Sequence, residues 1–477
     1  MTNTADSPGS RLASAFGKAV SVAGNAVTVA DQSALSTSRM DALVREAVFG
    51  EAAVREAARW LIWELGQAVG VCSASIHDLY IARGRGEVRG FTVPAINVRG
   101  MAYDTARAIF RVAKQMEAGA FILEIARSEI AYTDQRPAEY TAVMLAAALR
   151  EGFRGPVFIQ GDHFQVNAKK YAANPAAEVD SVKLLATEAV AAGFFNIDID
   201  TSTLVDLSHA ALDDQQRLNY EVGVDITRHV RALEPKGVTI SLGGEIGEVG
   251  TANSTVAELR AFMAGYNRVL GSQANGMAGL SKISVQSGTS HGGVVLPDGS
   301  IADVKLDFNT LRELGEVARR EYGLAGAVQH GASTLPDAAF NNFPKCETAE
   351  IHLATGFQNM LYEGLPGGVR DEMYAWLRSN AAEERKPSDS DEQFYYKTRK
   401  KALGPFKRQL WDLGEEARTA IGGALEEKFR FLFTQLAVGG TAAAVERHVR
   451  PLAERRPAPS GGAQAVQAAP DDPDAGE

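Results

Sequence analysis

The chain has 477 residues, and 49 Lys and Arg against 59 Asp and Glu give it a formal net charge of −10. This acidic balance argues against a nucleic-acid-binding protein, which needs a basic face to neutralise phosphates. No apolar run approaches the roughly 18 residues that a membrane helix needs, so we expect no membrane span. The length predicts either two or three domains or one large α/β barrel with extensions.

The sequence contains only two cysteines, Cys72 and Cys346. Two cysteines exclude a disulfide framework and favour a cytoplasmic protein in a reducing environment. They also exclude a zinc site built from thiolates alone, because such a site needs more of them. Any metal ion must therefore be held by histidine and carboxylate side chains.

The two ends of the chain differ in composition from its middle. The N-terminal region, 1–75, begins with some forty residues rich in Ser, Ala, Thr and Asn, which predict a mobile arm. Residues 38–69 then carry apolar side chains three and four positions apart, as helices do. Beyond the middle, 366–450 predicts amphipathic helices that pack on the rest of the protein or on a second subunit. The last segment, 451–477, is rich in Pro, Gly and Ala and is expected to be disordered.

Between these ends, short β-type runs alternate with helical stretches. Repeated βα units imply a parallel sheet, and eight of them close into a (β/α)8 TIM barrel, which needs about 250 residues. Residues 76–365 supply that length, so we predict a barrel there with an N-terminal helical extension and C-terminal helices. The eight predicted strands are 91–98, 120–126, 156–160, 194–200, 237–242, 280–286, 325–329 and 349–354.

Polar side chains follow four of these strands directly. His163 follows the third strand, Glu245 the fifth, His291 the sixth and His330 the seventh. Barrel enzymes carry their active sites at the C-terminal ends of the strands, so these four side chains share one face. Three imidazoles and a carboxylate suit a borderline cation such as Zn²⁺ and leave room for a substrate oxygen.

Glycines and a serine accompany these histidines. Gly292 and Gly293 follow His291, while Gly331 and Ser333 follow His330. Backbone N–H groups at such glycines, together with a hydroxyl, can hold a phosphate group. Barrels often bind phosphate after strands seven and eight, so the sequence predicts a phosphorylated substrate.

In this order, the motifs resemble those of the class II, metal-dependent fructose-bisphosphate aldolases. The resemblance covers about residues 76–360 and includes segments that match the family's first and fourth strands and its metal and phosphate motifs. The matching segments are GFTVPAINV at 90–98, GDH at 161–163, IDIDTSTL at 197–204, GEIG at 244–247, SHGGV at 290–294 and QHGAS at 329–333.

The resemblance implies a zinc-dependent aldolase that reversibly cleaves fructose 1,6-bisphosphate to dihydroxyacetone phosphate and glyceraldehyde 3-phosphate. One catalytic Zn²⁺ per chain would be held by the three histidines and the glutamate named above, with Asp200 near the metal and a second cation possible. Asp162 would act as acid/base on the C4 hydroxyl. Family members are usually dimers or tetramers, so a homo-oligomer is expected, with no nucleic-acid or membrane partner.

The sequence also departs from the family pattern. The strand-eight motif, usually Asn-Ile-Asp-Thr-Asp, reads His-Leu-Ala-Thr-Gly at 352–356, so only Thr355 is kept as a substrate or phosphate contact. The stretch 250–253 lacks the carboxylate that the family carries in its mobile loop, and Glu248 stands at a different offset. Gly-Gly-Ser-Gly after the last histidine reads Gly-Ala-Ser-Thr at 331–334.

These departures leave three hypotheses for the function. The first is cleavage of fructose 1,6-bisphosphate. The second is a class II aldolase or lyase that acts on another ketose phosphate, or on a substrate with a sulfonate or carboxylate group. The third is a non-catalytic aldolase-like barrel subunit, which the missing loop carboxylate favours and the retained Asp162 and ligand set disfavour.

Overall fold

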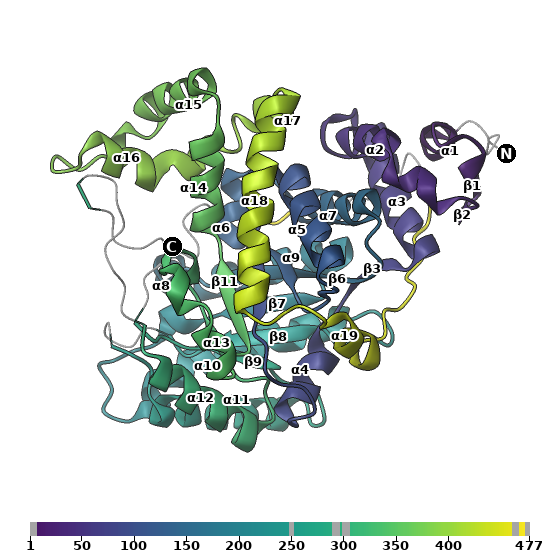
Figure 1. Cartoon of the computed structure of the whole chain (residues 1–477). Coiled ribbons are helices and arrows are strands. Elements are labelled where there is room, and N and C mark those ends of the chain that lie inside the picture. Colours follow the sequence, from purple (N-terminus) through teal and green to yellow (C-terminus); the bar gives the residue numbers. More distant parts are fainter. Residues whose placement is uncertain (1–6, 248–251, 289–295, 298–305, 460–466, 473–477) are drawn as a thin grey trace.

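Eight parallel strands form a closed barrel at the centre of the molecule (Figure 1). The computed structural model describes residues 7–247, 252–288, 296–297, 306–459 and 467–472. Neighbouring strands pair in chain order, and the last strand pairs with the first, which confirms the predicted TIM barrel. The barrel strands are β4 (Val93–Asn97), β5 (Ile122–Ala126), β6 (Gly155–Gln165), β7 (Asn196–Asp200), β8 (Ser241–Glu245), β9 (Lys282–Ser284), β10 (Ala327–Gln329) and β11 (Glu350–Leu353).

Helices surround the barrel and connect its strands. Their starts are locally encoded; Thr255 and Glu258, for example, form a reciprocal capping box at the start of α11. Among the described residues, no helix combines the length and the apolar composition needed to cross a membrane. The connecting helices are α5 (Ala102–Gln115), α6 (Arg127–Tyr132), α7 (Pro137–Glu151), α8 (Ala168–Ala173), α9 (Pro175–Ala192), α10 (Leu212–Leu233), α11 (Val256–Gln273), α12 (Phe308–Tyr322), α13 (Asn342–Lys345) and α14 (Thr355–Gly364).

Several strands differ from the sequence-based expectation. Strand β6 runs to Gln165, five residues beyond its predicted end at 160. Strand β8 begins four residues later than predicted and runs through two glycines to Glu245. Gly243 and Gly244 pair with β9, but they have no side chains, so the sequence pattern did not predict a strand there. A further strand, β3 (Val71–Ala74), pairs with the N-terminal half of β6 outside the closed barrel. Glu245 therefore ends a strand and is fixed by the β-ladder.

The prediction of a mobile N-terminal arm is wrong for the described residues from 7 onward. They form α1 (Pro8–Ser14) and a hairpin of β1 (Val20–Ala23) and β2 (Ala26–Val29), followed by α2 (Ser38–Phe49) and α3 (Ala52–Val69). Helix α1 packs against α3 so closely that a Cβ on Gly9 would lie 2.8 Å from the Trp60 ring. Phe16 is buried and belongs to the same hydrophobic core cluster as Trp60.

The C-terminal helices pack on the barrel, one of the two possibilities that the sequence left open. Helix α18 (Glu415–Gln435) runs along α5, and Arg418 and Asp104 form a two-point ion pair between these helices, with NH2–Oδ1 at 2.9 Å. The other elements of this region are α15 (Gly367–Asn380), α16 (Asp391–Thr398), α17 (Lys407–Trp411) and α19 (Ala442–His448).

The final segment has no helix or strand in 451–459 and 467–472, yet it is held in place there. The Trp60 indole N–H donates to the Arg456 carbonyl at 3.0 Å, and the Trp63 indole N–H donates to the Glu454 carbonyl at 2.6 Å. Asp472 is 1% exposed and lies 2.9 Å from the Lys170 ammonium. The expectation of a disordered tail is therefore wrong for these residues.

Candidate active site and metal centre

A β-bulge in β6 presents two consecutive polar residues to the barrel mouth. The pairing of β6 with β7 shifts register between Gly161 and Phe164, and His163 takes a left-handed backbone conformation with φ of +40°. Gly161 is required because a Cβ there would lie 2.4 Å from the Phe164 ring. Successive strand residues normally face opposite sides, but the bulge lets both Asp162 and His163 approach His330.

Three of the predicted metal ligands converge. The Nδ1 atoms of His163 and His330 each lie 3.6 Å from Glu245 Oε2, and the two imidazole centroids are 4.2 Å apart. Ligand atoms of a tetrahedral Zn²⁺ stand roughly 3.4 Å apart, since each lies about 2.0–2.1 Å from the ion. These three residues, here called the metal layer, therefore fit a single divalent cation.

Asp200 lies beside the metal layer, as expected from the sequence. Its Oδ2 atom accepts hydrogen bonds from His163 Nδ1 at 3.0 Å and Gln165 Nε2 at 2.6 Å, and its Oδ1 atom accepts from the Ser202 hydroxyl at 2.7 Å. Burial alone would raise the pKa of Asp200, but the hydrogen bond and charge of His163 hold it below its usual value. Because one Nδ1 atom cannot both donate to Asp200 and bind a metal, a cation in the metal layer would replace the proton shared by His163 and Asp200.

Asp162 is buried next to the metal layer. Its Oδ2 accepts a hydrogen bond from Asn97 Nδ2 at 2.9 Å, and its Oδ1 lies 3.1 Å from Nδ1 of His352 on β11. Burial raises the pKa of this carboxyl, but the charges of His163 and His352 outweigh it and hold the pKa well below the usual value. Asp162 is therefore ionised.

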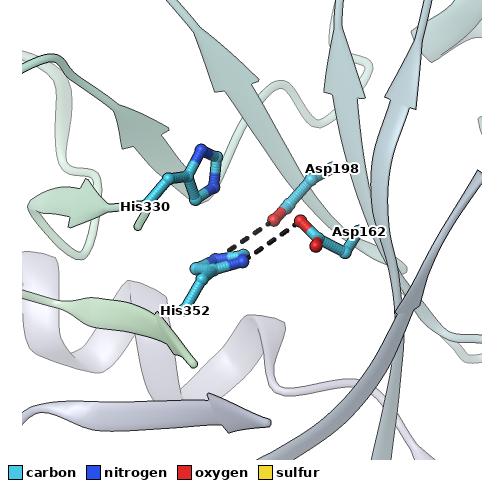
Figure 2. Close-up of side chains that lie close together, drawn as sticks. All are labelled: Asp162, Asp198, His330 and His352. Atoms are coloured by element: carbon cyan, nitrogen blue, oxygen red, sulfur yellow. Dashed lines mark hydrogen bonds and ion pairs between the residues drawn. The ribbon is translucent and has the colours of Figure 1, made fainter. Parts of the chain in front are cut away.

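Below the metal layer lies a second charged cluster that the sequence analysis did not predict. It consists of Asp198 on β7, Lys282 on β9, and Glu350 and His352 on β11, here called the deep layer. Figure 2 shows His352 between Asp162 and Asp198, with His330 facing them. The sequence does contain a feature that could have revealed this cluster. Glu350 and His352 are polar residues two positions apart inside a buried strand, and such residues face the same side of the sheet.

The remaining predicted residues lie at the same end of the barrel where the structure describes them. Gly331 follows His330 with a positive φ of +66°, and Ser333 lies in the short helix after it. Thr355 begins α14 at the end of β11, and a Cβ on its neighbour Gly356 would lie 2.9 Å from the Ser333 carbonyl. His291 and Gly292 lie outside the described residues.

Cations gather at another part of this rim, around α6. The Lys400 ammonium lies 5.7 Å from the centre of the Tyr132 ring, and burial together with nearby Arg99 lowers the pKa of Lys400 to about 8. The buried hydroxyls of Ser128 and Tyr132 and the Nε atom of Arg399 have no hydrogen-bond partner among the described residues. Crowded cations and unpaired buried donors are features of an anion site.

Comparison with known proteins agrees with this geometry. The family described as fructose-bisphosphate aldolase class II matches residues 85–432, most of the chain. The chain belongs to this family. No curated protein matches the sequence.

Solved structures similar to this chain are named for several different activities. A fructose-bisphosphate aldolase from Campylobacter jejuni is 16% identical, with 78% of this chain and 97% of that chain covered and a TM-score of 0.47. A probable tagatose 6 phosphate kinase from Sinorhizobium meliloti is 15% identical, with 75% and 99% covered and a TM-score of 0.51. A fructuronate-tagaturonate epimerase from Cohnella laeviribosi is 12% identical, with 90% and 94% covered and a TM-score of 0.47. At 15% identity and a TM-score of 0.51, the likeness to the Sinorhizobium meliloti structure concerns the fold alone.

Proposed function

We propose that this chain is a zinc-dependent aldolase that reversibly cleaves fructose 1,6-bisphosphate to dihydroxyacetone phosphate and glyceraldehyde 3-phosphate. The observation that carries the proposal is the metal layer beside an ionised Asp162. His163 and His330 present their Nδ1 atoms to the same carboxylate oxygen of Glu245, each at 3.6 Å. The family match supports aldolase chemistry at this place in the barrel.

The donor set fits Zn²⁺, with His163, Glu245 and His330 as ligands and His291 as a further ligand expected from the sequence. When bound there, the cation would polarise the ketone oxygen of the substrate. Asp162 would accept the proton of the C4 hydroxyl as the bond between C3 and C4 breaks, and would return it in the condensation direction. Both Asp162 oxygens retain acceptor capacity, since each ionised oxygen accepts more than one hydrogen bond.

Phosphate recognition is supported by two parts of the rim. The first is the cation-rich region around α6, where the Lys400 ammonium lies 5.7 Å from the Tyr132 ring and the buried hydroxyls of Ser128 and Tyr132 find no hydrogen-bond partner among the described residues. The second consists of Gly331, Ser333 and Thr355, expected together with Gly292 to bind phosphate. Two separated anion sites suit a ketose with a phosphate at each end.

His352 gives a specific reason to keep a second candidate substrate. This histidine stands where the family pattern has asparagine, and it contacts Asp162 rather than the open mouth of the barrel. A changed strand eight alters the groups available to the sugar hydroxyls. Another phosphorylated ketose, cleaved by the same metal-dependent reaction, is therefore the second candidate.

The test is retro-aldol cleavage by purified protein, with and without a chelator, on fructose 1,6-bisphosphate and a panel of other ketose phosphates. We expect chelator-sensitive cleavage of fructose 1,6-bisphosphate that zinc restores. Cleavage of only another ketose phosphate would establish the second candidate. Protein that contains about one zinc per chain but cleaves none of the panel would support a non-catalytic barrel subunit.

The proposal includes a homo-oligomer, a dimer or a tetramer, in the cytoplasm. Cys72 and Cys346 are both buried and unpaired, which is consistent with a reducing compartment. Sedimentation of the purified protein would give the number of subunits.

A further inference from the structure

The Asp162 carboxylate is held from two sides inside the barrel. Asn97 on β4 donates to Oδ2 at 2.9 Å. From the other side, Nδ1 of His352 on β11 lies 3.1 Å from Oδ1, as Figure 2 shows for His352 and Asp162. These contacts matter because Asp162 sits in the bulge of β6, where the backbone departs from regular strand geometry. The orientation of its side chain therefore depends on these two neighbours as well as on the strand.

The His352 ring cannot turn freely. Its Nδ1 atom also lies 3.1 Å from Glu124 Oε1, and its Nε2 atom lies 2.8 Å from Glu350 Oε1. Both ring nitrogens thus face carboxyl oxygens, which hold the ring on two sides. The ring is a fixed donor toward Asp162.

Lys282 forms buried ion pairs with Glu350 and Asp198, the two carboxylates that lie near His352. Its ammonium group is fully buried and lies 2.5 Å from Glu350 Oε1 and 2.9 Å from Asp198 Oδ1. The intervening strand β8 carries Gly243, where a Cβ would lie 2.2 Å from Asp198 Oδ1 and 2.9 Å from Lys282 Cε. Glycine at this position therefore leaves space for the ion pair between Asp198 on β7 and Lys282 on β9, which flank β8.

We propose that His352 is a positioning residue that holds the Asp162 carboxylate in its reactive orientation, and that Lys282 is an internal cation that fixes His352 through Glu350 and Asp198. This inference rests on the proposed function, in which Asp162 moves the proton. In this inference His352 acts through Asp162 rather than through a metal, and the zinc content of the variants decides between the two, since Asp162, Asp198, His330 and His352 also form a group able to hold a cation. A misplacement of about 1 Å can cost about a hundredfold in rate, so a loose Asp162 would be costly.

The main test compares His352→Leu, which removes the donor, with His352→Gln, which keeps one. In zinc-loaded enzyme we expect His352→Leu to lower kcat about a hundredfold, with KM changed less than about threefold and zinc content unchanged. His352→Gln should recover to within about tenfold of the original kcat. Thr348→Val is the matched control, because it removes a buried hydroxyl just before β11 that has no hydrogen-bond partner in the described part of the chain.

Glu350→Gln keeps the test decisive if His352→Leu does not fold. This substitution preserves shape but removes the charge beside His352 Nε2, and we expect kcat to fall about tenfold with KM unchanged. A kcat within about threefold of the original in His352→Leu, or in Glu350→Gln where that is the folded variant, would overturn the inference. So would loss of zinc in parallel with kcat, since His352 would then act through the metal.

A crystal structure of the tested variant separates this inference from the proposed function. We expect the Asp162 carboxylate to rotate away from its contact with Asn97, and an unmoved carboxylate would contradict the positioning role. This readout needs no turnover. If the unmodified enzyme cleaves no ketose phosphate, the proposed function fails while the placement of Asp162 by His352 is still decided.

Discussion

The metal layer and the deep layer of the barrel both contain imidazole and carboxylate side chains, but the two layers serve different purposes. Both place imidazole and carboxylate groups within a few ångströms of one another, but the deep layer also contains an ammonium group, that of Lys282, and the metal layer does not. The Glu245 side chain in the metal layer is 19% exposed, whereas those of Lys282 and Glu350 are fully buried. In the deep layer, the buried Lys282 ammonium permanently offsets the negative charge of the carboxylates. The metal layer has no lysine, so its side chains are suited to an exchangeable metal ion.

Removal of a ligand from the metal layer should have the largest effect on activity. We expect His330→Ala to lose bound zinc and all detectable cleavage together, because one of the convergent imidazole ligands is gone. Elemental analysis and the cleavage assay would be run on the same preparation. His229→Ala, on the partly exposed face of α10, is the control and should keep both; a zinc-replete, active His330→Ala would show that the ligand is misassigned.

Asp162 separates proton transfer from metal binding. Asp162→Ala should retain zinc but lower kcat by about 10²–10⁴, since general acid–base groups contribute of that order. Steady-state cleavage assays on protein of measured zinc content provide the comparison. Activity close to that of the unmodified enzyme would rule out the acid/base role.

The deep layer should respond in stability rather than in metal content. Lys282→Met leaves Asp198 and Glu350 without their buried partner, so we expect a loss of about 3–5 kcal/mol in the free energy of unfolding, measured in urea. Zinc should still bind to the folded variant. Lys183→Met is the control, because its ion pair with Asp225 is part-exposed and should be worth about 1 kcal/mol or less; equal losses in the two variants would show that the deep layer is not special.

The smallest effect concerns the thiol of Cys72 in β3. Burial raises its pKa to about 11, so at pH 8 only about one thiol in a thousand is ionised, and the reactive fraction rises only as the pH approaches 11. We expect almost no labelling by a thiol reagent in the native protein at pH 8 and full labelling in denaturant. Rapid native labelling at Cys72, located by mass spectrometry, would show that this region opens.

The sequence predicted the barrel well because buried parallel strands are short apolar runs separated by helices, and each of the eight runs became a strand. It also predicted the convergence of His163, Glu245 and His330, since residues at strand ends meet at one face whatever the details of packing. The β-bulge at Gly161 was not foreseen. It depends on backbone geometry, which residue periodicity does not describe.

The deep layer was missed for a different reason. His352 was interpreted only as a departure from the family's asparagine, although Glu350 two residues earlier faces the same side of β11. Its partners Lys282 and Asp198 come from other strands, so their pairing depends on register across β7, β8 and β9. The hairpin at Gly24-Asn25 was missed because its polar composition was taken to indicate mobility, while alternating valines on both sides indicated strands.

The contact between the C-terminal segment and α3 gives the molecule an optical reporter. Trp60 and Trp63, two of its four tryptophans, each donate an indole hydrogen bond to the backbone of this segment, and the Arg456 guanidinium lies 3.3 Å from the centre of the Trp63 ring. Release of the segment would expose both indoles to water and remove a charged group from one of them. Tryptophan emission therefore follows the docking of this end of the chain separately from the unfolding of the barrel.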